Sequence, residues 1–348
     1  MSLLSGDPPR SRLLALLLIL ILVLLAVAPF AFPGPRALAV AAKILIFIVL
    51  VASYDLLLGY TGIVSFAHTM FFGIGAYGVA IASTRMEPGW TAIGLGLLVA
   101  LALSLLFALL IGLASLRVRA IFYAMITLAV AAAFQTLSSQ LSWLTGGEDG
   151  LNFKVPQILR PAYKAFSQPV LGLNIDGRII TYYLIFLATL VLFLLLLRIV
   201  NSPFGRVLQA IRENAFRAEA IGYPTVLYRS ASNVLAALFA TVAGALYALW
   251  LRYNGPDTTR SFEIMLNILL MLVIGGMGTM YGAVLGATLF VFAQSYLQDG
   301  LHVLHESVSA IGFIAPLFEP DRWLLWLGVL FVLSVYYFPG GIAGKLRR

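Results

Sequence analysis

Long apolar runs separated by short polar segments make up most of the chain. Ten of these runs are close to the roughly 20 residues that a helix needs to cross about 30 Å of hydrocarbon. We therefore predict ten membrane-spanning helices, with an even number that would place both termini on one side of the membrane. The runs lie at approximately 13–32, 37–58, 64–84, 91–116, 120–141, 179–200, 229–252, 263–280, 282–298 and 322–338.

The first of these runs also has features of a secretory signal. Arg10 and Arg12 precede it, and residues 26–28 (Ala-Val-Ala) are similar to a cleavage site. Against cleavage, Pro29 follows directly, and the apolar run continues through Phe32 to spanning length. We therefore expect a retained first helix.

The composition also indicates an integral membrane protein. Hydrophobic residues form 61% of the chain and charged residues only 10%, with a mean hydropathy of +1.00, whereas ordinary soluble domains are about a quarter charged. We predict an all-α, multi-pass fold that forms one transmembrane domain over residues 1–348. The net charge of +8 is spread over short segments without a basic stripe, so we expect no nucleic-acid partner.

The distribution of charge predicts the orientation in the membrane. If both termini are cytoplasmic, the inside segments carry more basic residues and far fewer acidic residues than the outside segments. Cytoplasmic loops are enriched in Lys and Arg in this way. We therefore predict cytoplasmic termini and a cytoplasmic location for residues 202–223, which separate the sixth and seventh runs.

This cytoplasmic stretch, "SPFGRVLQAIRENAFRAEAIGY", has the pattern of one amphipathic helix. Ser202 is a favourable N-cap, Pro203 stands at the first helical position, and Gly222 with Pro224 ends the helix. Apolar residues at three- or four-residue spacing form one face, and charged residues occupy the others. The apolar face includes Phe204, Val207, Leu208 and Ile211, and the charged positions include Arg206, Arg212, Glu213 and Arg217.

Two interpretations of this helix stay open on the pattern alone. A basic amphipathic helix is able to lie in the lipid interface with its apolar face in the membrane. It is equally able to dock its apolar face into a groove of a cytosolic protein.

Two glycine-rich segments differ from plain spans. In "LGYTGIVSFAHTMFFGIGAYG" (58–78), glycine and small polar residues predict backbone that is broken or lines a cavity, although hydrogen-bonded helix packing explains Thr61, Ser65 and Thr69 as well. In "IGGMGTMYGAVLG" (274–286), glycines at four-residue spacing predict a close-packing helix face. The glycines predicted to pack helices are Gly73, Gly278, Gly282 and Gly286.

The sequence carries few motifs of catalytic, nucleotide-binding or metal-binding proteins. The chain has no phosphate-binding loop and no hydrolase or metalloprotease signature, so we expect neither an enzyme nor a bound nucleotide. His302, His305 and Glu306 have a spacing that would suit a metal, but a polar external helix explains them better, and we expect no metal site. Lys43 and Asp55 lie within apolar runs, where a functional role and interface anchoring are both open.

Five separated motifs resemble one known family. The stretch from residue 202 resembles the coupling segment of permease subunits in ABC importers for branched-chain amino acids, and "TGGEDGL" (145–151) resembles the external motif of the larger permease of each pair. "LLLGYTGIVSFAHTMFFGIGAY", "GGMGTMYGAVLGA" and "YFPGGIAGKL" resemble further motifs of that family, in the same order. The chain departs from the pattern at Phe66-Ala67, where the family more often has a glycine next to the histidine.

The resemblance implies a fold like that of type II importers and a role for several sets of residues. A coupling segment at about 201–224 would dock into an ATPase subunit, with Ser202, Pro203, Phe204, Gly205, Arg206, Ala210, Ile211, Arg212, Glu213, Asn214, Ala218 and Gly222. Its apolar residues would face the ATPase groove or the membrane. The translocation path would include Tyr60, Thr61, Gly62, Ser65 and His68. The external loop, about 142–178, would carry Gly146, Gly147, Glu148, Asp149 and Gly150.

The resemblance also implies partners and a location. We expect cytosolic ATPase subunits that bind ATP, a second homologous permease, and a periplasmic or extracellular binding protein that delivers substrate to a permease in the bacterial inner membrane. Leucine, isoleucine and valine are the implied substrates, with urea, short amides or aromatic acids as alternatives. A different class, an ion-driven secondary transporter, would use the 202–223 helix only as a brace at the lipid surface.

Overall fold

The computed structural model describes residues 11–32, 34–115, 120–164, 175–308 and 315–347, and these residues are mostly helical. The longer helices are α1 (Arg12–Ala31), α2 (Pro35–Thr61), α4 (Trp90–Ser115), α5 (Ala120–Gln140), α7 (Gly177–Val200), α10 (Thr225–Leu251) and α13 (Met280–Val308). The shorter helices are α3 (His68–Arg85), α6 (Ser142–Thr145), α8 (Pro203–Glu213), α9 (Ala215–Ala220), α11 (Pro256–Thr259), α12 (Phe262–Gly275), α14 (Trp323–Tyr337) and α15 (Gly341–Arg347). Short 3-10 turns occur at Gln157–Leu159, Ala315–Phe318 and Pro320–Arg322.

The predicted all-α, multi-pass architecture is confirmed. Within the described residues, nine helical segments are long and apolar enough to cross a membrane. The segment predicted at 64–84 is also helical, as α3, but it begins only at His68 and is not among those nine. α3 starts late because α2 ends at Thr61, its C-cap Gly62 has a left-handed conformation with φ 75°, and residues 62–67 leave the helical path.

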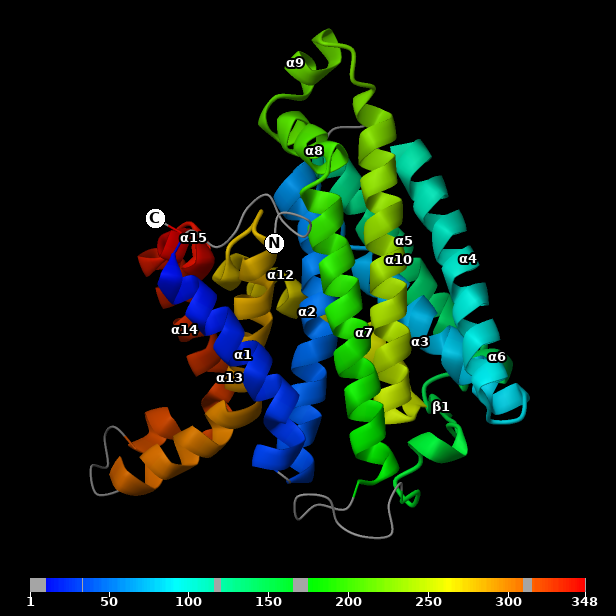
Figure 1. Cartoon of the computed structure of the whole chain (residues 1–348), viewed down its shortest axis with the longest axis vertical. Helices are drawn as coiled ribbons and strands as arrows, with labels where there is room; N and C mark the ends of the chain where they lie inside the picture. Colours follow the sequence, from blue (N-terminus) through cyan, green and yellow to red (C-terminus); the bar gives the residue numbers. More distant parts are fainter. Residues whose placement is uncertain (1–10, 33, 116–119, 165–174, 309–314, 348) are drawn as a thin grey trace.

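The centre of the bundle is formed by α2 and α10. Of the most apolar stretch of α2, 78% is buried, against 22% for α1 and for α4. α2 packs against α7, α10, α12 and α13, and α10 also packs against α3 and α4 (Figure 1). The outer helices instead expose large apolar side chains such as Leu16 and Leu98, which suits a surface in contact with lipid.

Buried hydroxyl and amide groups join the central helices. Asn233 Nδ2 of α10 donates to the carbonyl oxygen of Ala108 in α4 over 2.9 Å, and Thr241 Oγ1 of α10 donates to Ser104 Oγ over 2.6 Å. These bonds satisfy polar groups that water does not reach inside a hydrocarbon layer. α4 is therefore fixed to α10 by polar contacts as well as by packing.

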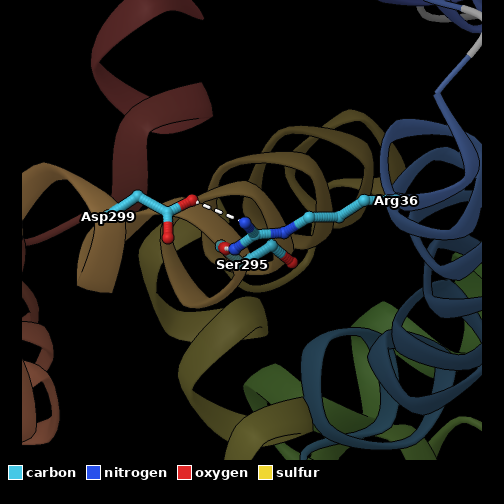
Figure 2. A network of polar contacts seen from close by, with 3 residues as sticks. All are labelled: Arg36, Ser295 and Asp299. Carbon is cyan, nitrogen blue, oxygen red and sulfur yellow. Dashed lines mark hydrogen bonds and ion pairs between the residues drawn. The ribbon is translucent and has the colours of Figure 1, made fainter.

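A surface network joins the start of α2 to α13. Arg36 reaches from the first turn of α2 to an ion pair with Asp299 at 2.8 Å, and its second terminal nitrogen donates to the carbonyl oxygen of Ser295 over 2.7 Å (Figure 2). Deeper in the bundle, Lys43 Nζ donates to Gln294 Oε1 over 3.0 Å. Both basic residues of α2 therefore connect it to the same helix.

The two ends of the bundle carry different structures. α8 and α9 form one end, and α6 with strand β1 (Leu151–Asn152) lies toward the other (Figure 1). β1 pairs antiparallel with β2 (Tyr253–Asn254), directly after α10. This two-residue ladder was not predicted, since strands so short carry no readable periodicity.

Candidate functional site

Residues 201–224 fold into two helices. As predicted, Ser202 caps the first of them, α8, by accepting a hydrogen bond from the Gly205 N–H through its Oγ, and Pro203 is the first helical residue. The prediction of one helix up to Gly222 is wrong, because the chain leaves helical geometry at Asn214 (φ −158°, ψ 99°). Asn214 Oδ1 accepts a hydrogen bond from the Arg217 N–H over 2.9 Å and so starts α9, as asparagine caps commonly do.

The apolar face of α8 packs on its own bundle. Leu208 and Ile211 are fully buried, where α8 contacts α2, α7 and α10, and the ring of Phe204 stacks on Tyr228 of α10 with centroids 5.7 Å apart. The expectation that this face meets a groove in another protein or the lipid is therefore wrong. Arg206, Ala210 and Glu213 lie on the exposed side of α8.

The exposed apolar residues of this segment lie on and after α9. Phe216 is 83% exposed and Ile221 is 67% exposed, followed by the partly exposed Tyr223. Ala218 on the same short helix is buried, so α9 is held against the protein on one side. An aromatic and an aliphatic side chain thus project from the end of the bundle, with Gly222 between them and the start of α10.

Arg212 connects α8 to the end of α2. Its Nη1 donates a hydrogen bond to the carbonyl oxygen of Gly59, in the last turn of α2. Its side chain also passes Gly62, where a Cβ would lie 3.1 Å from Arg212 Cγ. In addition, a Cβ on Gly278 would lie 2.8 Å from Arg212 Nη1, so the guanidinium sits where three segments meet.

The third segment at this point is the turn between α12 and α13. Gly278 has φ 78° and donates its backbone N–H to Asp55 Oδ1 of α2 over 2.8 Å. A side chain on Gly59 would overlap both Asp55 and Gly278. We call the group Arg212, Asp55, Gly59 and Gly278 the Arg212 junction, because it joins α8, α2 and the α12–α13 turn.

Asp55 is a fully buried member of the Arg212 junction. It is completely inaccessible to solvent, and its second oxygen, Oδ2, has no hydrogen-bond partner among the described residues. The charge of Arg212 acts on it electrostatically, which offsets part of the cost of an ionised carboxylate in an apolar interior. The alternative that Asp55 anchors α2 at the interface is therefore wrong.

The predicted path residues surround the break between α2 and α3. Tyr60, Thr61, Ser65 and His68 are all buried. Thr61 Oγ1 donates to the carbonyl oxygen of Leu56 and lies 2.9 Å from Ser232 Oγ of α10, and His68 Nε2 lies 3.0 Å from Ser53 Oγ. These contacts support the packing interpretation directly, and the role in a path stays a prediction.

Two apolar cavities in the described part of the bundle do not include these residues. One, of about 250 Å³, lies between α1, α2, α7 and α13. The other, of about 460 Å³, lies between α3, α4 and α5.

The glycines predicted for helix packing have different surroundings. Gly282 and Gly286 lie on α13 where it meets α12, and a Cβ on Gly286 would overlap the carbonyl group of Met271. Gly278 lies outside that helix face, in the turn of the Arg212 junction. Gly73 lies on α3 against the side chain of Arg260.

The external-loop motif is folded against the segment after α10. Gly146 ends α6 with φ 75°, and Gly147 and Gly150 also have positive φ. Tyr253 Oη donates to the carbonyl oxygen of Asp149 over 3.1 Å, while the side chains of Glu148 and Asp149 are exposed. Of the predicted loop at 142–178, residues 165–174 lie outside the described part.

Within the described part of the chain, no group of three or more possible metal ligands gathers at the histidine and acid residues of α13. His302 Nδ1 lies 3.4 Å from Glu306 Oε1, one helical turn away, and both side chains are largely exposed. The position suits a polar surface of a helix.

These features define the class of the protein, a multi-pass helical membrane protein with an amphipathic helix bonded into one end of its bundle. The chain belongs to the family of permease components of branched-chain amino acid transport systems, whose model matches residues 36–335. The importers of this family are of the ATP-binding-cassette type.

Curated relatives agree with this assignment. The chain is 27% identical over 321 residues to the high-affinity branched-chain amino acid transport system permease protein LivM of Salmonella typhimurium, covering 87% of this chain and 69% of the relative. It is 27% identical to BraD, the corresponding permease protein of Pseudomonas aeruginosa, over 84% of this chain and 90% of the relative. A probable LivM of Methanocaldococcus jannaschii is 30% identical over 48% of this chain and 46% of the relative. No solved structure matches the chain.

Proposed function

We propose that this permease translocates leucine, isoleucine and valine, and that the Arg212 junction transmits the work of ATP hydrolysis into the membrane domain. The junction is the observation that carries this proposal. A helix outside the spans donates a hydrogen bond to the main chain of the most buried span, which in turn accepts one from the α12–α13 turn. Displacement of α8 therefore acts on both segments.

The docking surface for the ATPase subunit is the exposed apolar tip at α9. Phe216 and Ile221 project from it, and apolar or aromatic anchors of this kind commonly dominate binding to a groove. Arg206 and Glu213 lie exposed beside the tip, on α8, and supply charged contacts at its rim. The apolar face of α8 acts inside the permease, where it holds the coupling segment to the bundle.

ATP-driven switching then needs two arrangements of the junction that differ in free energy. A ligand shifts a conformational equilibrium only through a difference in its affinity for the two states. Closure of the ATPase subunits around ATP favours one position of α9 and α8. Because Arg212 bonds to Gly59 in the position described, the other position breaks or moves this bond and releases the end of α2.

The remaining parts of the importer are separate chains. We assign ATP to the ATPase subunits, with no cofactor and no catalytic activity in this chain. A second homologous permease completes the path, together with membrane lipid around the outer helices. A soluble binding protein delivers substrate at the opposite end, where Glu148 and Asp149 are exposed for contact. The chain lies in the bacterial inner membrane with α8, α9 and both termini on the cytoplasmic side.

Uptake by the reconstituted importer tests the junction. With both permeases, the ATPase subunits and the binding protein in liposomes, Arg212→Met is expected to lower leucine uptake about tenfold or more, since a hydrogen bond from a charged group contributes about 1.5–3 kcal/mol. ATP hydrolysis should continue, because the tip at α9 is intact. Arg212→Lys should retain part of the uptake, and Arg12→Met, on exposed α1, should resemble the wild type.

Equal ratios of uptake to ATP hydrolysis in the wild type and in Arg212→Met would contradict the coupling role. Wild-type uptake that persists without the ATPase subunits would instead show an ion-driven carrier. Uptake of urea, short amides or aromatic acids in place of leucine would change the substrate and leave the coupling mechanism in place.

A further inference from the structure

We propose that Arg260 binds the carboxylate of the transported amino acid inside the membrane domain. This inference rests on the proposed function, because it concerns the substrate of the same permease. Arg260 follows α11 and precedes α12, within a segment apolar enough to span a membrane. Only 4% of its surface is exposed.

The guanidinium of Arg260 is only partly satisfied. Its Nη2 donates to Tyr77 Oη of α3 over 2.9 Å, and the group lies 4.6 Å from the centroid of the same ring. Nε and Nη1 are buried and have no hydrogen-bond partner among the described residues. Asp257 acts on Arg260 electrostatically, but no ion pair with it is formed within the described part of the chain.

A second unpaired donor belongs to the same segment. Asn254 is fully buried, and its Nδ2 also has no hydrogen-bond partner in the described structure. Its Oδ1 accepts a hydrogen bond over 2.8 Å from Thr259 Oγ1, the residue before Arg260. The unsatisfied groups of Asn254 and Arg260 are therefore all hydrogen-bond donors without an acceptor.

Such a set of donors points to an anion. An unpaired guanidinium in an apolar interior carries a desolvation cost of several kcal/mol, and arginine stays protonated under all ordinary conditions. Its planar fork of N–H groups matches the two oxygens of a carboxylate. Every amino acid brings one carboxylate, so the substrate supplies the missing acceptor as it passes.

The surroundings also suit the other half of a branched-chain amino acid. Gly73 leaves room for the stem of Arg260, since a Cβ there would lie 2.5 Å from Arg260 Cγ. Tyr77, which holds the guanidinium, also lines the apolar cavity of about 460 Å³ beside Leu103, Phe107 and Phe134. Tyr77 therefore lies between the guanidinium that would donate to the carboxylate and the apolar space for the side chain.

The segment also leads inward from the external loop. Asn254 pairs with Leu151 in the β1–β2 ladder, and Tyr253 bonds to the main chain of Asp149. These hydrogen bonds therefore connect the external motif directly to the segment that carries Arg260. A substrate released at this end of the bundle would meet Arg260 before the break between α2 and α3.

Ligand binding to the assembled importer without its binding protein tests the inference. Saturation-transfer NMR is recorded with leucine, with 4-methylpentanoate, which keeps the carboxylate but lacks the amine, and with 3-methylbutylamine, which lacks the carboxylate. The wild type is expected to bind the first two and not the third. Arg260→Met should bind neither leucine nor 4-methylpentanoate, and its leucine uptake should fall to about one tenth of the wild-type rate or below. Arg260→Lys should keep part of the binding and part of the uptake.

A stability measurement separates binding from a structural role. Because Arg260→Met removes a buried charge without an ion-pair partner, its melting temperature should equal or exceed that of the wild type, whereas a structural arginine would lower it. Arg178→Met, at the start of α7, is the control and should bind and transport like the wild type.

The outcomes distinguish the two proposals. Unchanged 4-methylpentanoate binding in Arg260→Met, or equal binding of 3-methylbutylamine by the wild type, overturns the inference and leaves the importer function standing. Loss of binding together with a lowered melting temperature also overturns it. Failure of the wild-type importer to take up any branched-chain amino acid overturns the proposed function, and the inference with it.

Discussion

At the scale of single residues, the contacts of two glycines determine how closely the permease segments approach one another. Gly59 and Gly278 lie between the carboxylate of Asp55 and the guanidinium of Arg212, and neither position has room for a side chain. The close approach lets main-chain groups bond directly to charged side chains. Small residues are used in this way where helices meet inside membranes.

Gly59→Ala is therefore expected to destabilise the protein and to weaken coupling. Its methyl group would overlap Asp55 and Gly278, and overpacking of this kind costs about 1–3 kcal/mol. Thermal unfolding in detergent, followed by uptake in liposomes, measures both effects. Gly94→Ala on α4 is the matched control, because nothing lies within 4 Å of a Cβ there. A melting temperature as high for Gly59→Ala as for Gly94→Ala would contradict the close approach.

The residue-level predictions from sequence succeeded where the cause is local. Ser202 and Pro203 start α8 as expected, because a cap depends on the next three residues. Arg260 was missed, since its significance comes from Tyr77, some 180 positions earlier, and from donors that find no partner in the fold. A lone arginine beside an apolar run gives no such signal in the sequence.

At the scale of elements, the apolar runs predicted the helices and their order, and the errors lie where a helix is interrupted. α3 starts at His68 because Gly62 turns the chain. Asn214 divides the coupling segment because its side chain starts a new helix. The glycine and small polar residues of 58–78 predicted the first break, whereas the helical pattern continues across Asn214 and did not reveal the second.

Under the proposed function, the division at Asn214 makes α9 the element that meets the ATPase subunit. Phe216→Asp is expected to prevent co-purification of the ATPase subunits with the permease in detergent, because it places a charge on the most exposed ring of the tip. Expression and melting temperature should change little. Trp143→Asp alters a largely exposed ring on α6 at the other end and should leave the complex intact.

Co-purification of Phe216→Asp at the wild-type ratio would place the docking surface elsewhere. The exposed charges of α8, Arg206 and Glu213, would then be the next surface to alter.

At the scale of the whole molecule, the buried α2 and α10 are surrounded by helices with exposed apolar sides. The sequence predicted ten spans, and nine helical segments of the described residues are long and apolar enough to cross a membrane. It did not predict which span is central, because an apolar side chain that faces lipid and one that faces protein have the same hydropathy. Burial along α2 follows from the contacts of α7, α10, α12 and α13 with it. Sequence reasoning therefore found the elements, and the packing order came from the structure.

The exposed network between α2 and α13 is expected to contribute little to global stability. Arg36 and Asp299 keep 60% and 52% of their side-chain surface exposed, and such pairs typically contribute about 0–1 kcal/mol. Arg36→Asp should lower the melting temperature slightly, and the double variant Arg36→Asp, Asp299→Arg should restore it. Thermal unfolding at low and at 1 M salt checks this, since salt screens exposed pairs. A large effect that persists at high salt would contradict it.

The connections at the two ends of α2 have a mechanical consequence. The helix has 27 residues, about 40 Å at 1.5 Å per residue, with Arg212 bonded near one end and Arg36 joined to α13 at the other. A rod of this length behaves as a lever. A tilt of about 5° displaces one end by roughly 3–4 Å relative to the other. A small tilt of α2 therefore displaces its Arg36 end by several ångströms relative to its Arg212 end, without any helix unfolding or changing its register.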